Sequence, residues 1–171
     1  HLKRVYYTPF HYRHEAAGYE GLPMVETPKW RVHRLYQADR LMQLYGFTAE
    51  EIAPDSQLNL SETLDPKAAW ALRHLDQFPV EVNRADYETL LRVPGIGTTY
   101  ASRIVKARQY CTITHSVLKK LGVSLKRSRH FITCNGVYDG VNVDNETVLI
   151  PFLTEPVDGD AFQTSLLERA M

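Results

Sequence analysis

The segment Pro94-Gly95-Ile96-Gly97 constrains the fold of this 171-residue chain more than any other segment. Apolar residues recur at helical spacing before it, at Leu90 and Leu91, and after it, at Ala101 and Ile104. This spacing predicts two amphipathic helices. The glycines on either side of Ile96 carry no Cβ atom, so the backbone can turn sharply and come close to a ligand. The sequence therefore predicts two helices joined by a tight turn.

This turn has the chemical features of an anion-binding site. Amides that begin a helix lack intrahelical acceptors and lie at the positive end of the helix dipole. A phosphate oxygen can bind to them. Such contacts read no base, so binding to nucleic acid would tolerate any sequence and would weaken with salt. The alternative is a non-catalytic interaction module whose helices serve only for packing or for protein contacts.

Residues 90–104, Leu-Leu-Arg-Val-Pro-Gly-Ile-Gly-Thr-Thr-Tyr-Ala-Ser-Arg-Ile, resemble the helix-hairpin-helix motif of DNA-binding proteins. The resemblance implies that hairpin amides hold a backbone phosphate and that nearby carbonyls hold a monovalent cation, K⁺ or Na⁺. By position, the phosphate-binding amides are those of Gly95, Gly97 and Tyr100. The cation-binding carbonyls are those of Leu91, Val93 and Ile96.

The charge of the chain is segregated, although its formal sum is zero from 20 basic and 20 acidic side chains. Residues 84–130 carry ten basic and two acidic side chains, a net charge of +8, whereas residues 1–83 and 131–171 are net acidic. This pattern favours a middle segment that faces a polyanion, unless the fold mixes the charges. The side chains expected to assist phosphate binding are Thr98, Arg103, Lys106, Lys126, Arg127 and Arg129.

A degenerate second copy of the turn follows the first. Residues 118–125, Leu-Lys-Lys-Leu-Gly-Val-Ser-Leu, align with residues 90–97. The copy keeps the first turn glycine, as Gly122, and replaces the second with Leu125. The resemblance implies paired hairpins, so we expect a tandem helix-hairpin-helix unit in which the second copy is structural.

The expected fold class is mainly α, a tandem helix-hairpin-helix unit with preceding helices and minor strand at both ends. Capping and turn residues predict helices that start near Thr27-Pro28, Thr48 and Asp65-Pro66, and Asn83 is expected to cap the first helix of the hairpin. Two further helices are expected over residues 114–121 and 125–132, and strands over residues 2–10 and 147–152.

Four segments are expected along the chain. Residues 1–28 read as the remnant of an upstream domain and its linker, and residues 29–82 as a helical connecting region. Residues 83–133 form the expected DNA-binding unit, and residues 134–171 an acidic tail.

Several functions are disfavoured by what the sequence lacks. Two cysteines, Cys111 and Cys134, rule out a disulfide scaffold. The resemblance implies that glycosylases with this motif place a catalytic Asp some twenty residues beyond the hairpin glycines. Residues 98–138 contain no Asp or Glu, so no catalytic residue is assigned. His11 and His14 leave open a metal site beside the simpler interpretation of surface histidines. No apolar run reaches the roughly 20 residues of a membrane span, so a cytoplasmic location is expected.

A wider resemblance covers residues 3–136. It rests on the segments Lys3-Arg4-Val5-Tyr6-Tyr7, His33-Arg34-Leu35-Tyr36-Gln37-Ala38-Asp39, Asn59-Leu60, Leu64-Asp65-Pro66-Lys67, Trp70-Ala71-Leu72-Arg73-His74, Phe78-Pro79-Val80-Glu81-Val82-Asn83-Arg84-Ala85 and Phe131-Ile132-Thr133-Cys134-Asn135-Gly136. They resemble the C-terminal part of a bacterial family of DNA modification/repair radical-SAM proteins, typically encoded beside a uracil-DNA-glycosylase-like protein. The resemblance implies a 4Fe-4S cluster and S-adenosylmethionine in an upstream barrel, because two cysteines cannot hold that cluster. It also implies the glycosylase-like protein as a partner.

The acidic tail contains one further motif. The sequence Gln163-Thr164-Ser165-Leu166-Leu167 loosely resembles the peptide by which bacterial replication and repair proteins dock on the sliding clamp. The two leucines would enter a groove of the clamp while the glutamine orients the backbone. The alternative is that Leu166 and Leu167 cover the core of their own domain.

Overall fold

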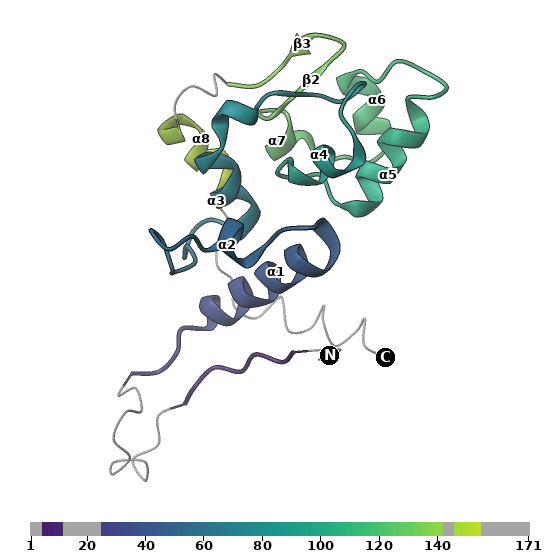
Figure 1. Cartoon of the computed structure of the whole chain (residues 1–171). Coiled ribbons are helices and arrows are strands. Elements are labelled where there is room, and N and C mark those ends of the chain that lie inside the picture. The colour runs from purple at the N-terminus through teal and green to yellow at the C-terminus, as the bar shows by residue number, and fades with distance from the viewer. Residues whose placement is uncertain (1–4, 12–24, 142–145, 155–171) are drawn as a thin grey trace, which may run out of the picture.

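The computed structural model describes residues 5–11, 25–141 and 146–154. Helices dominate it, and a small three-stranded sheet lies at one end (Figure 1). The expected fold class, mainly α with minor strand, is confirmed. The elements are α1 (Lys29–Tyr45), α2 (Ala49–Ile52), α3 (Pro66–Arg73), a 3-10 helix (Leu75–Gln77), β1 (Val80–Glu81), α4 (Tyr87–Arg92), α5 (Thr98–Ala107), α6 (His115–Lys120), α7 (Leu125–Ser128), β2 (Ile132–Cys134), β3 (Val137–Tyr138) and α8 (Glu146–Leu153).

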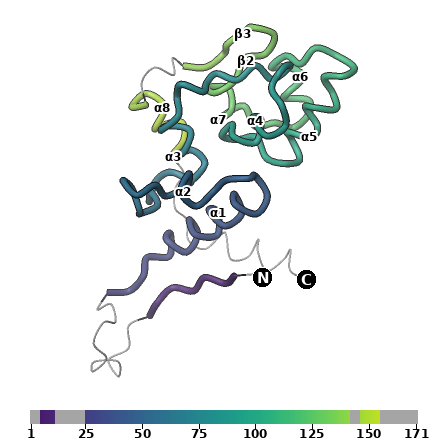
Figure 2. Tube along the Cα trace, viewed as in Figure 1, coloured from purple at the N-terminus to yellow at the C-terminus, as the bar shows by residue number. Residues whose placement is uncertain are grey.

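Helix α3 connects the N-terminal helices to the rest of the chain (Figure 2). It packs against α1 and α2, and six of its eight residues are buried. The Asp65 side chain caps it by accepting a hydrogen bond from the amide of Ala68 at 2.9 Å, and Pro66 fills its first position, as the sequence predicts. The Trp70 ring packs edge-on against Phe47 and Phe78. This apolar contact fixes α3 in the core.

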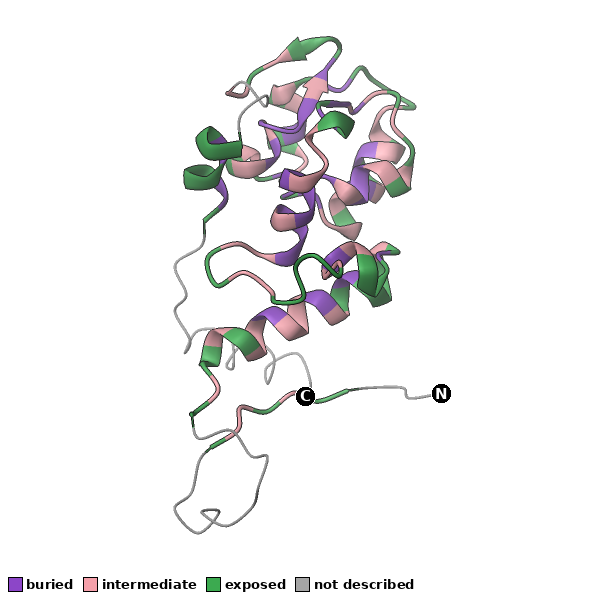
Figure 3. Cartoon of the chain, turned by 60° about the vertical axis from the view of Figure 1, so that its left-hand side comes forward, coloured by how far each residue is buried: buried purple, intermediate pink, exposed green. Residues whose placement is uncertain are grey.

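Two helical hairpins follow. The first hairpin consists of α4, the turn at residues 93–97 and α5, and the second hairpin consists of α6, the turn at residues 121–124 and α7. Aliphatic side chains from both are fully buried, among them Leu90, Ile104 and Leu118. Buried residues gather in the interior of the molecule, and exposed residues lie on its loops and on the outward faces of its helices (Figure 3).

The sheet joins the chain segments before and after the two hairpins. Strand β1 precedes the first hairpin and pairs in parallel with β2, with Val80 opposite Ile132. Strand β2 follows the second hairpin and pairs in antiparallel fashion with β3. The parallel pairing therefore closes the segment that contains both hairpins into a loop.

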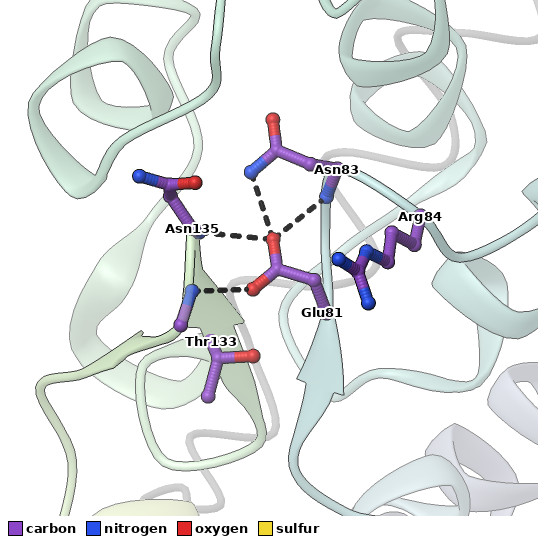
Figure 4. Close-up of a pocket in the computed structure, with 6 residues that line it drawn as sticks. Glu81, Asn83, Arg84, Thr133 and Asn135 are labelled. Atoms are coloured by element: carbon purple, nitrogen blue, oxygen red, sulfur yellow. Dashed lines mark hydrogen bonds between the residues drawn. The ribbon is translucent and has the colours of Figure 1, made fainter.

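The Glu81 carboxylate reinforces this closure (Figure 4). Its Oε1 atom accepts hydrogen bonds from the Asn83 amide and side chain, at 3.0 and 2.8 Å, and from the Asn135 amide at 3.0 Å. Its Oε2 atom accepts one from the Gly136 amide at 2.9 Å. Burial raises the pKa of Glu81, but these hydrogen bonds outweigh burial and lower the pKa to about 2. The carboxylate lines a pocket with Arg84 and Thr133, and its four hydrogen bonds clamp the chain after β1 to the β2–β3 turn.

We expect this clamp to make stability depend on acid pH. Because the pKa of Glu81 is lowered from 4.5 to about 2, its stabilisation is complete above pH 4.5 and is lost as the pH falls to about 2. Replacing Glu81 with glutamine should lower the free energy of unfolding at pH 7 by about 1–2 kcal/mol. Urea unfolding at pH 7, 4 and 2.5 measures this difference, with the exposed Glu88→Gln as the control. Parallel pH curves for wild type and Glu81→Gln would contradict the assignment.

Some local predictions were wrong. Residues 5–10 form no strand, and residues 147–152 belong to helix α8. Asp86, not Asn83, caps α4, because the Asn83 side chain pairs with the backbone of Ile113 instead, at 2.7 and 3.0 Å. Helix α7 ends at Ser128, and Ile132 begins a strand.

Other predictions fall outside the described residues. They concern residues 163–167, with the motif resembling a clamp-binding peptide, and His14. Among the described helices, none combines the length and the apolar character that crossing a bilayer requires.

Candidate nucleic-acid interface

The predicted turn is present, and its backbone is partly exposed. Gly95 is exposed and has a φ of +86°, a conformation that favours glycine. Ile96 beside it is 1% exposed and belongs to the core, so it anchors the turn. Gly97 is the N-cap residue of α5, and Thr98 and Tyr100 lie in the first turn of that helix. The first hairpin thus places the amides of Gly97 and Tyr100 at the start of α5, and that of Gly95 in the turn just before it.

Capping differs between the two helices of each hairpin. The first helix is capped by a side chain, since Asp86 accepts from the amide of Thr89 in α4 and Thr114 accepts from that of Val117 in α6. The second helix is not, because no described side chain caps α5 at Gly97 or α7 at Ser124. The first amides of α5 therefore stay available for another acceptor.

The second hairpin repeats the first with a register that differs from the predicted one. Gly122 has a φ of +87° and matches Gly95, and Ser124 is the N-cap residue that matches Gly97. The prediction that Leu125 replaces the second glycine is therefore wrong by one position, because Ser124 stands in its place. Aligning Leu118 with Leu90 gives the wrong partner for Gly97, because the turn is one residue shorter in the second hairpin.

The two hairpins pack against each other reciprocally. A Cβ atom added to Gly95 would lie 3.3 Å from the backbone nitrogen of Ser128 and 3.5 Å from the Cβ of Arg127, both in α7. A Cβ atom added to Gly122 would lie 3.4 Å from the Tyr100 ring, in α5. Each turn therefore rests on the second helix of the other hairpin.

The predicted basic side chains differ in their surroundings. Lys106 and Lys126 are exposed, and Arg103 is exposed while donating a hydrogen bond to the Leu121 carbonyl at 3.0 Å. Arg127 instead forms an ion pair with Asp65 at 2.9 Å, and Arg129 forms one with Asp139 at 2.6 Å. Ion pairs within the chain thus hold two of the five predicted basic side chains, and a backbone carbonyl holds a third.

A residue that the sequence analysis did not assign lies against the turn. The Lys67 ammonium donates a hydrogen bond to the Ile96 carbonyl at 2.5 Å, and the whole residue is 8% exposed. Its Nζ atom lies 4.9 Å from the centre of the Tyr45 ring, and the Tyr45 hydroxyl lies 3.2 Å from the position of a Cβ on Gly97. Burial lowers the pKa of Lys67 to about 7, against the attraction of Asp65.

The other candidate groups form no second site. His130 is buried, and its Nδ1 atom accepts a hydrogen bond from the Val141 amide at 3.2 Å. Burial raises the pKa of Cys134 to about 12, so its thiol is inert at neutral pH. Within the described ranges, no group of three or more His, Cys, Asp or Glu side chains could hold a metal ion.

Comparison with known families identifies a match described as a helix-hairpin-helix motif over residues 76–114. The matched segment runs from the end of the 3-10 helix through β1 and the whole first hairpin to the residue before α6. No curated protein and no solved structure matches the chain. The chain therefore contains a helix-hairpin-helix motif, which is consistent with DNA binding in general.

Proposed function

We propose that this chain binds duplex DNA through the phosphate backbone, without reading sequence, and that the first amides of α5 hold a phosphate oxygen. The observation that carries the proposal is the uncapped start of α5 beside an exposed glycine turn, within the segment that matches the helix-hairpin-helix motif. Amides there offer donors and a positive dipole end to an anion.

Exposed basic side chains support the proposal. Helices α5, α6 and α7 together carry Arg103, Lys106, Lys119, Lys120 and Lys126, all exposed. Helices α5 to α7 contain no acidic residue. A cationic surface of this kind attracts the DNA backbone and releases its counterions on binding.

The relation between the two hairpins favours duplex over single-stranded DNA. Each turn rests on the second helix of the other hairpin, and from this reciprocal packing we infer an approximate two-fold relation between the two second helices. The two strands of a DNA duplex are related by two-fold axes as well, and DNA-binding proteins use such symmetry to contact both strands. One hairpin would then face each strand, with the first supplying the phosphate site.

Fluorescence anisotropy with two unrelated duplexes tests the proposal. We expect similar affinity for both, with Kd in the range of about 1–100 μM at physiological salt, and a linear fall of log K with log salt. Binding that does not change with salt, or that occurs only with one sequence, would contradict it. Binding to a protein partner with no affinity for DNA would instead favour the interaction module.

Single lysine and arginine variants sharpen this test. Replacing the exposed Lys126 with alanine should lower the salt slope by about one unit for both duplexes, as expected for one lost phosphate contact. Replacing Arg129 with alanine should lower it less, because Asp139 already engages its guanidinium. Equal reductions of the salt slope in the two variants would show that DNA binding breaks the ion pair between Arg129 and Asp139.

A finer proposal concerns the context of this activity. We propose that the chain is the DNA-holding region of a DNA modification/repair radical-SAM protein, whose cluster and S-adenosylmethionine belong to another domain. Its support is the resemblance of residues 3–136 to that family. Co-purification with the glycosylase-like protein, with or without DNA, tests the partner. A pull-down that recovers neither that protein nor a cluster-containing domain would contradict the proposal.

A further inference from the structure

A positively charged side chain of α3 lies against the turn of the first hairpin. The Lys67 ammonium, on the first turn of α3, donates to the Ile96 carbonyl at 2.5 Å. The residue is buried, and the Tyr45 ring lies 4.9 Å from the ammonium. Burying the charge of a lysine is costly, and burial lowers the pKa of Lys67 to about 7, so the ammonium prevails below neutral pH. A carbonyl dipole, an aromatic face and the nearby Asp65 favour this charged form.

This arrangement does not fit a metal ion on the same carbonyl. The helix-hairpin-helix resemblance implies K⁺ or Na⁺ on the carbonyls of Leu91, Val93 and Ile96. The Ile96 carbonyl oxygen is already the acceptor for the ammonium, and the Val93 carbonyl accepts the Ile96 amide at 3.1 Å. A cation bound beside Lys67 would meet a like charge in a poorly solvated site, where repulsion is strong.

We infer that the Lys67 ammonium takes the place of a metal ion at the first hairpin and acts there as a positioning residue for the phosphate-binding turn. Its bond to the Ile96 carbonyl fixes the peptide that leads into Gly97, whose amide belongs to the phosphate site. Its charge adds to the positive potential at the start of α5. The effect of Lys67 on DNA binding rests on the proposed function, whereas its effect on the conformation of the turn does not.

The surrounding contacts extend this role to the second hairpin. Asp65, which caps α3, accepts a hydrogen bond from Arg127 in α7 at 2.9 Å. The first turn of α3 thus reaches the turn of the first hairpin through Lys67 and the second helix of the second hairpin through Asp65. Two oppositely charged side chains, two positions apart, hold both hairpins to one helix end.

Chemical rescue in the free protein tests the inference without DNA. At pH 6 and fixed ionic strength, we expect the Tm of wild type to be the same in KCl and in tetramethylammonium chloride. Lys67→Ala should lower the Tm by about 5 °C or more. Methylammonium, a small N–H donor, should restore at least half of the loss, whereas tetramethylammonium, which has no N–H group, should restore none. Arg40→Ala, at an exposed position of α1, is the matched control and should respond to neither ion.

Two outcomes of this experiment would overturn the inference. A wild-type Tm that rises with K⁺ over tetramethylammonium would show that a metal ion binds. A loss in Lys67→Ala that methylammonium does not repair would show that only the packing of the lysine stem matters. If Lys67→Ala does not fold, the DNA measurement with Lys67→Met, which keeps the length of the side chain, decides instead.

DNA binding provides the second measurement. Lys67→Met should weaken duplex binding by about fivefold or more while leaving the salt slope unchanged, since Lys67 contacts no phosphate. Lys126→Ala should instead lower the slope. Unchanged affinity of folded Lys67→Met beside a DNA-binding wild type would overturn the inference. If the wild type binds no DNA, the proposed function fails, and the rescue experiment alone decides the role of Lys67.

Discussion

Replacement of Gly97 by valine is expected to weaken duplex DNA binding by about tenfold or more. Gly97 has a φ of −97°, which any residue can adopt, so the backbone itself accepts the change. The new methyl groups would stand beside the first amides of α5 and exclude a phosphate oxygen from them. Anisotropy measures the affinity, and circular dichroism confirms that the variant is folded. Wild-type affinity in a folded variant would remove the phosphate site from this turn.

A contact behind Gly97 requires a matched control. A Cβ atom at this position would lie 3.2 Å from the Tyr45 hydroxyl, so part of any effect could come from displacing α1. Comparing Gly97→Ala in wild type and in a Tyr45→Phe background separates the two causes. If exclusion of the phosphate is the cause, Gly97→Ala should weaken DNA binding by the same factor in both backgrounds.

Replacement of Gly95 by alanine is expected to lower the free energy of unfolding by about 2–4 kcal/mol. Two costs combine. The φ of +86° is strained for any residue with a Cβ, at about 1–2 kcal/mol. The added Cβ would also lie 3.3 Å from the backbone nitrogen of Ser128, so α7 must shift. Urea unfolding of wild type and variant measures the difference.

Gly122 is the natural control for this prediction. Its φ of +87° gives the same backbone strain, but its neighbours are the side chains of Tyr100 and Arg103, which can move aside. We therefore expect Gly122→Ala to cost only about 1–2 kcal/mol. Equal losses of unfolding free energy in Gly95→Ala and Gly122→Ala would mean that α7 moves away from the new Cβ atom as easily as the side chains near Gly122 do.

The hairpin and most helix ends could be predicted because their causes are local. Asp65-Pro66 and the Thr48 capping box start helices as expected, and Gly46 ends α1. The glycine-aliphatic-glycine turn has few other conformations available. In each case, the residues that decide the structure lie within one helical turn of one another.

The errors arise where distant contacts decide. Residues 147–152 form a short apolar run that fits a strand or a buried helix equally well, and packing of α8 against α7 selects the helix. Asn83 could have capped a helix, but the backbone of Ile113, 30 residues away, binds its side chain. The contact of Lys67 could not be predicted, because nothing in its local sequence shows that its acceptor is the carbonyl of Ile96.

The contacts of Asp65 and Lys67 have a consequence for how the chain opens. Because one helix end holds both hairpins, the amides of α3 and those of the two hairpins should exchange with deuterium as one cooperative unit rather than in separate steps. A fragment cut at residue 83, the expected start of the DNA-binding unit, would keep both turns but lose both of these side chains. Native-state hydrogen exchange would therefore show that the smallest autonomous unit begins upstream of Asp65 and includes both hairpins.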